Sequence, residues 1–255
     1  MPSGWAYLSI VSNVIFQKTN VAHWNYLIRV YQLGWEKFGA IDAVISNAGV
    51  SSGEVHLQHD IDPTTNLLRA PPLDTLEINL IAHIYMTKCA GKKCQIVLTS
   101  SAATFLDTPP LYLYSTAKAG VLGLMRSLRT NLPKSNIATN TVAPWFTGKD
   151  TGALSLLGEI KIDTNRLMTA TPMVPKALTD VWEKLPANTP AGIAIALLLP
   201  IIQPEINGKT FFVAGNEIVE LEDTLARSQP QWMGEELSRN VDEGQRRLLG
   251  ADPFE

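Results

Sequence analysis

The segment Tyr114-Ser115-Thr116-Ala117-Lys118 places a phenol and an ammonium group four residues apart on a predicted helix. Side chains at this spacing share one face of an α-helix. A free tyrosine has a pKa near ~10 and is a poor base at neutral pH, but a nearby ammonium group favours the phenolate and lowers that pKa. The pair therefore indicates proton transfer near neutral pH. Alone, the same spacing is also common in surface pairs.

Two more polar residues complete a candidate acid/base site. Ser101 follows a predicted strand, where its hydroxyl could hold a substrate oxygen. Asn79 lies in the predicted helix before that strand, where it could bind backbone or a water near Lys118. Taken singly, a serine after a strand is often part of a turn and a helical asparagine is usually exposed. Their conjunction with Tyr114 and Lys118 is far more specific, and we predict all four as catalytic.

Alternating apolar segments must position these residues. The pattern predicts strands at residues 14–18, 41–45, 95–100, 137–142 and 209–214. It predicts helices at residues 21–38, 73–90, 111–132, 189–199 and 234–249, with a loop over 49–72 and irregular chain over 144–186. Gly39 supplies a helix stop signal.

Strand segments that are apolar on both faces and alternate with helices are typical of a parallel sheet covered on both sides. We therefore expect one Rossmann-like, doubly wound α/β domain over residues 1–255, with an atypical start at 1–13, a substrate loop at 145–186 and a tail at 216–255. Ligands of such sheets bind at the carboxyl ends of the strands. Asn47, Ser101 and Pro144 all come just past a predicted strand, so they should share one edge.

Composition limits the classes of partner. The 255 residues are 45% hydrophobic and 18% charged, with a net charge of −3, which favours a compact domain and no nucleic acid or anionic membrane as partner. The two cysteines, Cys89 and Cys94, suggest neither a metal site nor a disulfide framework, so we expect a reducing, cytoplasmic setting. No apolar run is long enough to predict a membrane span.

Several motifs together resemble the short-chain dehydrogenase/reductase (SDR) family. They are Ile-Asp-Ala-Val-Ile-Ser-Asn-Ala-Gly at 41–49, Ile-Asn-Leu at 78–80, Ile-Val-Leu-Thr-Ser-Ser at 96–101, Tyr-Ser-Thr-Ala-Lys-Ala at 114–119 and Asn-Thr-Val-Ala-Pro at 140–144. Their order and spacing fit, and the interval to Tyr114 selects Ser101 over Ser100. The resemblance covers roughly residues 14–215. The segment from Trp145 and the tail look closest to fungal members of the prostaglandin-dehydrogenase-like branch.

The resemblance implies a role for each motif residue. Tyr114 would be the general acid/base, and Lys118 would lower its pKa and bind the nicotinamide ribose. Ser101 would orient the substrate, and Asn79 would anchor a proton-relay water. The cofactor, NAD or NADP, would be bound by Asn20, Asn47, Ala48, Gly49, Tyr114, Lys118, Pro144 and Thr147. The resemblance also implies a homodimer or homotetramer that pairs through the helices at 73–90 and 111–132.

The family's usual beginning is missing from this pattern. A first strand, a glycine-rich turn and a helix should precede the Asn-Ala-Gly segment, yet only 46 residues precede Asn47 and their glycines are Gly4, Gly34 and Gly39. We therefore expect this first strand–turn–helix unit to be absent or replaced. If it is absent, a truncated gene model or splice form accounts for the gap; if it is replaced, residues 5–11 fill one vacated strand position. Removing a central strand should either leave unpaired sheet edges or force the sheet to be connected differently. Trp145 also stands where the family has glycine.

Three functions remain open. The first is an oxidoreductase that passes hydride between NAD(P) and a carbonyl or secondary alcohol of a medium-sized, fairly apolar metabolite, such as a secondary metabolite. The second is a cofactor-independent isomerase, lyase or cyclase that uses the same Ser-Tyr-Lys site. The third is a non-catalytic member that serves as a dimer partner. We favour the first, because lineage and site chemistry agree on it.

Overall fold

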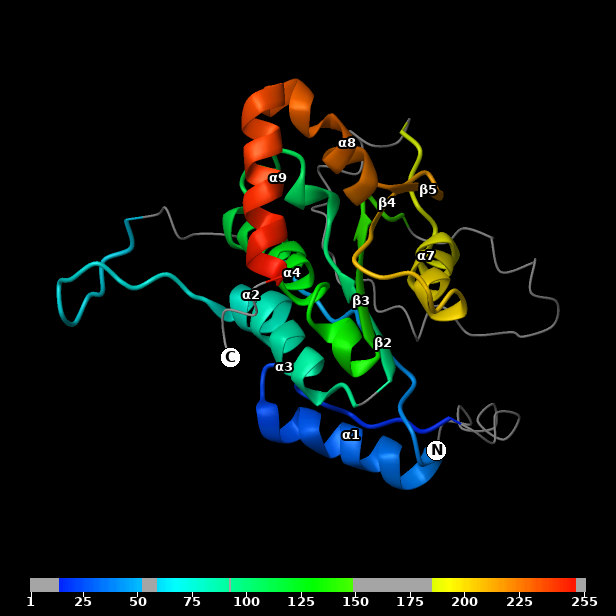
Figure 1. Ribbon diagram of the computed structural model, residues 1–255. Helices are drawn as coiled ribbons and strands as arrows, with labels where there is room; N and C mark the ends of the chain where they lie inside the picture. The colour runs from blue at the N-terminus through cyan, green and yellow to red at the C-terminus, as the bar shows by residue number, and fades with distance from the viewer. Residues whose placement is uncertain (1–13, 52–58, 92, 149–184, 251–255) are drawn as a thin grey trace.

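The computed structural model describes residues 14–51, 59–91, 93–148 and 185–250 (Figure 1). A five-stranded sheet in the order β1-β2-β3-β4-β5 forms its centre. The strands are β1 (Ala43–Ser46), β2 (Cys94–Thr99), β3 (Ile137–Pro144), β4 (Thr210–Ala214) and β5 (Glu217–Glu220). The first four run parallel and β5 is antiparallel to β4. The predicted doubly wound α/β class is confirmed.

Helices cover both faces of this sheet, as Figure 1 shows. Along β2, successive side chains point to opposite faces, and all six of its residues are buried. One face packs against a helix layer made by α1 (Trp24–Phe38), α3 (Ala82–Cys89) and α4 (Tyr112–Leu128). The other face packs against α7 (Pro190–Ile202), which buries Ala196 and Leu197 on Val97 and Val142. A sheet buried on both sides explains why its strands read as continuous apolar runs.

The predicted helix over 73–90 forms as three consecutive pieces. A single turn, α2 (Asp74–Leu76), is followed by a π-helical segment, η2 (Glu77–Ile81), and then by α3. A π segment adds one residue to a turn and rotates the side chains that follow, a feature frequent at functional sites. Here it contains Asn79.

The prediction of a strand at residues 14–18 was wrong. These residues lie outside any strand, and Phe16 is 80% exposed. A strand needs a neighbour to satisfy its backbone, and among the described residues β1 pairs only with β2. Within the part of the chain that the structure describes, β1 therefore presents the expected unpaired edge. The expectation that residues 5–11 fill a vacated position lies outside the described residues, as does most of the substrate loop.

Two elements were not predicted, and several bounds shift. Strand β5 follows a two-residue turn in which Gly215 and Asn216 both have positive φ, the conformation that two-residue hairpins require. Helix α8 (Glu222–Met233) precedes α9 (Glu235–Gly250); it is polar and contains Pro230, which hid it. Helix α1 begins at Trp24 rather than at 21, and α4 ends at Leu128 rather than at 132. Two short 3₁₀ turns flank α4: η3 (Ala102–Thr104) precedes it and η4 (Leu132–Ser135) follows it.

Within the described ranges, no helix is both long and apolar enough to cross a membrane. Those same ranges contain no cluster of His, Cys, Asp and Glu that could hold a metal ion.

Candidate active site

The ends of three parallel strands and the first half of α4 converge on the candidate site. Asn47 follows β1, Ser101 follows β2, and Pro144 is the last residue of β3. The parallel register pairs Ser46 with Leu98 and Thr99 with Val142, so these strand ends lie along one edge of the sheet. The predicted clustering follows directly from that register.

Ser101 and Tyr114 are joined by a side-chain hydrogen bond. The Ser101 Oγ also accepts a hydrogen bond of 3.2 Å from the backbone N–H of Ala103, as the N-cap of η3. That backbone bond fixes the serine hydroxyl beside the phenol. Because the hydroxyls of Ser101 and Tyr114 lie side by side, both can bind one substrate oxygen.

Lys118 lies almost entirely inside the protein, with 2% of its surface exposed. Its Nζ donates a 2.7 Å hydrogen bond to the carbonyl oxygen of Thr99 and lies 5.7 Å from the centroid of the Tyr114 ring. The backbone carbonyl of Lys118 accepts a 2.9 Å bond from Ser100 Oγ, which ties α4 to the end of β2. Burial lowers the pKa of Lys118 to about 8.

The pKa of Tyr114 differs from the expectation. Burial raises it, and the hydrogen bond with Ser101 lowers it only in part. The ammonium of Lys118 faces the ring and is engaged by Thr99, so it does not produce the lowered pKa that the four-residue spacing suggested. In this structure the phenol is therefore held in its protonated form at neutral pH.

Asn79 is fully buried and binds backbone, one of the two roles considered for it. Its amide nitrogen donates to the carbonyl of Val50 at 2.7 Å, and its Oδ1 accepts from the N–H of Val50 at 2.8 Å. This pair of bonds holds the loop after β1. At Gly49, just before, a Cβ would lie 3.3 Å from Asn79 Oδ1 and 3.6 Å from Lys118 Nζ. The bare glycine thus keeps a small gap open beside the ammonium.

The other predicted cofactor contacts fall into two groups. Asn47 accepts a 2.9 Å bond from Thr99 Oγ1, and Ala48 and Gly49 continue that loop. Beyond β3, Thr147 is exposed and forms a single parallel bridge with Asn188.

Asn20 is far from these residues in the chain and in its contacts. It is exposed before α1, and its Oδ1 accepts a 3.1 Å bond from the N–H of Ala22. Its predicted place near an adenine stays a prediction.

Sequence reasoning missed two buried polar residues near this site. Asn188 is 1% exposed; its amide donates to Val213 and its Oδ1 accepts from the N–H of Asn216, which fixes the chain beside the end of β3. His83 is also 1% exposed, one helical turn after Asn79. An asparagine before Thr-Pro and a histidine among apolar residues are weak signals, because both patterns are common without function.

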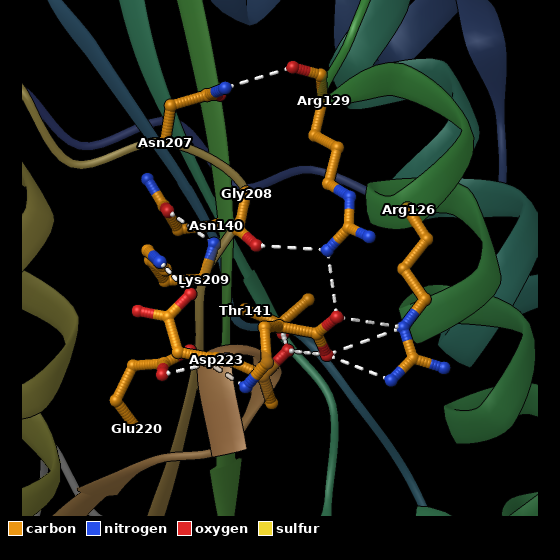
Figure 2. A network of polar contacts seen from close by, with 11 residues as sticks. Arg126, Arg129, Asn140, Thr141, Asn207, Gly208, Lys209, Glu220 and Asp223 are labelled. Atoms are coloured by element: carbon orange, nitrogen blue, oxygen red, sulfur yellow. Dashed lines mark hydrogen bonds and ion pairs between the residues drawn. The ribbon is translucent and has the colours of Figure 1, made fainter. Parts of the chain in front are cut away.

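A polar network holds the far end of α4, the helix that carries Tyr114 and Lys118 (Figure 2). Glu222, at the start of α8, receives three hydrogen bonds from Arg126 and a 2.7 Å bond from Arg129. Thr210 on β4 donates a further 3.0 Å bond to the same carboxylate. Although burial raises the pKa of Glu222, the bonds to Arg126, Thr210 and Arg129 outweigh it and lower the pKa overall. The network joins α4, β4 and α8, and so fixes the axis on which Tyr114 lies.

The residues present fit the nicotinamide–ribose half of a dinucleotide. Lys118 offers a buried ammonium, Tyr114 and Ser101 offer hydroxyls, and Gly49 leaves room beside them. The pyrophosphate half normally needs a glycine-rich turn at a helix N-terminus. The described residues contain no such turn.

Comparison with known proteins gives the lineage. Residues 8–155 match the family model described as short chain dehydrogenase. The chain is 28% identical over 249 residues to the short-chain dehydrogenase/reductase prx4 of Penicillium roqueforti, covering 94% of this chain and 72% of that protein. It is 22% identical over 244 residues to the short-chain dehydrogenase/reductase ATR7 of Stachybotrys chlorohalonatus, covering 92% and 74%.

Among solved structures, a short chain dehydrogenase from Mycobacterium avium has the same fold. The TM-score is 0.54 at 18% identity, covering 84% of this chain and 65% of that one. The chain therefore spans about two thirds of the length of that structure. The family model covers more than half of the chain, and the fungal relatives match nearly all of it. This chain therefore belongs to the short-chain dehydrogenase/reductase family.

Proposed function

We propose that this chain is an NAD(P)-dependent oxidoreductase that interconverts a carbonyl group and a secondary alcohol, with Tyr114 as general acid/base. One observation carries the proposal. The hydroxyls of Ser101 and Tyr114 are hydrogen-bonded, and the buried ammonium of Lys118 lies 5.7 Å from the tyrosine ring. Family membership supports the reaction class.

Each residue has a role that follows from its position. A substrate oxygen between Ser101 and Tyr114 would accept a hydrogen bond from each. Because burial keeps Tyr114 protonated, the site is prepared to donate a proton, the direction required for carbonyl reduction. Lys118 would hold the nicotinamide ribose through its buried ammonium. NAD(P), when bound, supplies or accepts the hydride.

The substrate proposed is a medium-sized, fairly apolar metabolite. Trp145 and Phe146 follow β3 at the site edge and are each half-buried. Their rings supply apolar surface where a small glycine would give none. Pockets for small molecules are mostly apolar with few polar groups, and apolar residues that follow β3 at the edge holding Ser101 suit such a pocket.

Cofactor titration tests the proposal. Purified protein is titrated with NADH and with NADPH while tryptophan fluorescence is followed, and reduction of apolar ketones is then assayed with the cofactor that binds. Tyr114→Phe should still bind cofactor through the ammonium of Lys118 and lose activity by about 100-fold or more. Tyr26→Phe, on the exposed face of α1, is the matched control. Absence of binding by either cofactor at millimolar concentration would refute the proposal for this chain.

A second candidate function, one that needs no cofactor, is favoured by the edge of the sheet at β1. Among the described residues, β1 has a partner on one side alone, and no glycine-rich turn lies beside it. Yet Ser101, Tyr114 and Lys118 are held by β2 and α4, on the paired side of the sheet. The same site would then catalyse isomerisation, elimination or cyclisation by proton transfer without hydride. Turnover that proceeds in cofactor-free protein would support this reading, and a strict requirement for NAD(P)H would exclude it.

The proposal includes a homodimer or homotetramer. Helix α7 contains no polar side chain, and its Ile195, Leu198 and Ile202 are 62%, 47% and 71% exposed. A helix that is apolar all round is normally covered. The family resemblance instead favours the faces of α3 and α4. Light scattering of wild type, Ile195→Lys and Ile84→Lys (on α3) distinguishes the two faces, and a monomeric wild type would refute an oligomer.

A further inference from the structure

Residues 59–70, which we call the arm, carry apolar side chains that lie outside the core. Ile61, Leu67 and Leu68 are 48%, 68% and 58% exposed. Among the described residues, every hydrogen bond and ion pair of the arm joins two residues of the arm itself. Figure 1 shows this cyan segment extending from α2 away from the sheet, on the side that α3 and α4 cover. The arm therefore projects beyond the helix layer of its own chain.

The arm is a closed hairpin with a fixed turn. Ile61 and Leu68 pair as an antiparallel bridge, and the N–H of Asp62 donates to the carbonyl of Leu67 at 2.9 Å. Asp62 Oδ1 also accepts a 2.8 Å bond from the N–H of Thr64. A side-chain acceptor bonded to the backbone two residues on is a device that stabilises turns. The apolar side chains are thus held on a backbone of defined shape.

Such a hairpin needs a surface to pack against. An isolated two-stranded hairpin is marginally stable in water, because ordering its backbone costs more than its few bonds return. Burial of its apolar side chains offsets that cost. Within the described ranges, the body of the chain leaves Ile61, Leu67 and Leu68 about half exposed or more. The surface that covers them therefore lies outside the described part of this chain.

The arm is joined stiffly to the helix layer. Pro71 and Pro72 connect it to Leu73, and α2 begins at Asp74. A proline fixes its own φ and restricts the residue before it, so two in succession limit the directions that the arm can take. A molecule that docks on the outer face of α3 and α4 would therefore also meet the arm.

The outer face of α4 suits close approach by a second helix layer. Thr116, Ala119 and Gly123 are exposed and lie three and four residues apart, so they share one face. A Cβ on Gly123 would meet no atom within 4 Å. The hydroxyl of Thr116 donates to the carbonyl of Tyr112 at 2.8 Å, so it needs no water. Ile84, 40% exposed, adds apolar surface from α3. Small side chains at the contact let two helix faces pack closely.

We infer that the arm packs against a second copy of this chain, which pairs across α3 and α4, and that Ile61, Leu67 and Leu68 make the contact. A two-fold interface repeats every contact, so the arm of each copy is covered by the other. A second copy supplies the same small-residue face beside each arm. The inference rests on the oligomer proposed above and is independent of the proposed reaction.

Photocrosslinking between isotopically distinct copies tests the contact. The full chain with Leu67→p-benzoylphenylalanine is equilibrated with nitrogen-15-labelled wild type, irradiated, digested and analysed by mass spectrometry. We expect crosslinked peptides that join one isotope to the other and that include residues of α3 or α4. The same substitution at Tyr26, 53% exposed on α1, is the control and should give none. Crosslinks confined to a single copy, or made to a different face, would overturn the inference.

Analytical ultracentrifugation measures the strength of the contact. Leu67→Asp should raise the dimer dissociation constant by about 10-fold or more, the scale for a leucine that is no longer buried. Asp62→Ala should also raise it, because it loosens the turn without removing apolar surface. Leu237→Asp, 55% exposed on α9, should follow wild type.

The outcomes separate the arm from the other proposals. A dissociation constant unchanged in Leu67→Asp, with circular dichroism like that of wild type, would refute the role of the arm and leave the oligomer standing. A wild type that is monomeric at micromolar concentration would refute both. A dimer held by the arm that binds neither NADH nor NADPH would support the inference and refute the proposed reaction alone.

Discussion

Replacing Lys118 by Met should raise the free energy of unfolding at neutral pH and lower it at high pH. Burial lowers the lysine pKa from 10.5 to about 8, so holding the ammonium inside the fold costs about 3 kcal/mol at pH 7. Methionine removes that cost and also the bond to Thr99, worth about 1–2 kcal/mol. At pH 7 we therefore expect Lys118→Met to be more stable than wild type by about 1–2 kcal/mol.

The pH dependence has a fixed sign. Between about pH 8 and 10.5 the folded lysine has lost its proton and the unfolded lysine has kept it. The unfolded state then binds more protons, so the wild type gains stability with rising pH across this window. The variant lacks that gain. The two stabilities should cross near pH ~9 and differ in the opposite sense above it.

Urea unfolding at several pH values between 7 and 10.5 measures both curves. The other titratable groups are shared by both proteins, so their contributions cancel in the difference. Lys37→Met, at an exposed position of α1, is the control and should follow wild type throughout. Parallel curves for wild type and Lys118→Met would show that the lysine is not buried as an ammonium, and the reasoning would fail.

Three other substitutions test the surroundings of the site. Glu222→Gln should lower the free energy of unfolding by about 2 kcal/mol at pH 7, because its arginine partners are partly exposed, with Glu217→Gln on β5 as control. Since the folded pKa of Glu222 is lowered, this difference should shrink as the pH falls through that pKa; a constant difference would contradict it. Asn79→Leu should cost about 2 kcal/mol in urea unfolding by breaking both bonds to Val50. Gly49→Ala should cost about 1 kcal/mol by crowding Asn79, and should weaken NAD(P)H binding in a fluorescence titration; unchanged binding would place the cofactor elsewhere.

The candidate site could be predicted from sequence because its logic is local. Tyr114 and Lys118 share a helix face through their spacing, and Ser101 follows a strand whose parallel register brings it to the same edge. The sheet class followed from apolar strands between helices. These inferences need no knowledge of which distant residues touch. The sequence pattern was sufficient to predict these contacts because backbone geometry sets them.

The remainder depends on distant contacts that no pattern contains. A strand at residues 14–18 would need a neighbouring strand to pair with. Among the described residues, β1 pairs with β2 alone and its other edge has no partner. The Glu222 network joins residues almost one hundred positions apart. The raised pKa of Tyr114 depends on burial outweighing its hydrogen bond, a balance visible only in three dimensions. His83 was unremarkable in sequence until its ring proved buried against Ser46.

On the proposed function, the acid/base groups and the pyrophosphate half of the cofactor would lie on different parts of the sheet. Tyr114, Ser101 and Lys118 are held by β2 and α4, on the paired side of the sheet. Lys118 Nζ donates to the carbonyl of Thr99, and Ser100 Oγ donates to the carbonyl of Lys118. The pyrophosphate half of a dinucleotide would lie beyond β1, where the described sheet ends. A defect there would weaken cofactor binding without displacing the acid/base groups. Proton transfer at Tyr114 should therefore survive changes at the β1 edge that abolish NAD(P)H binding, which makes the two activities separable by experiment.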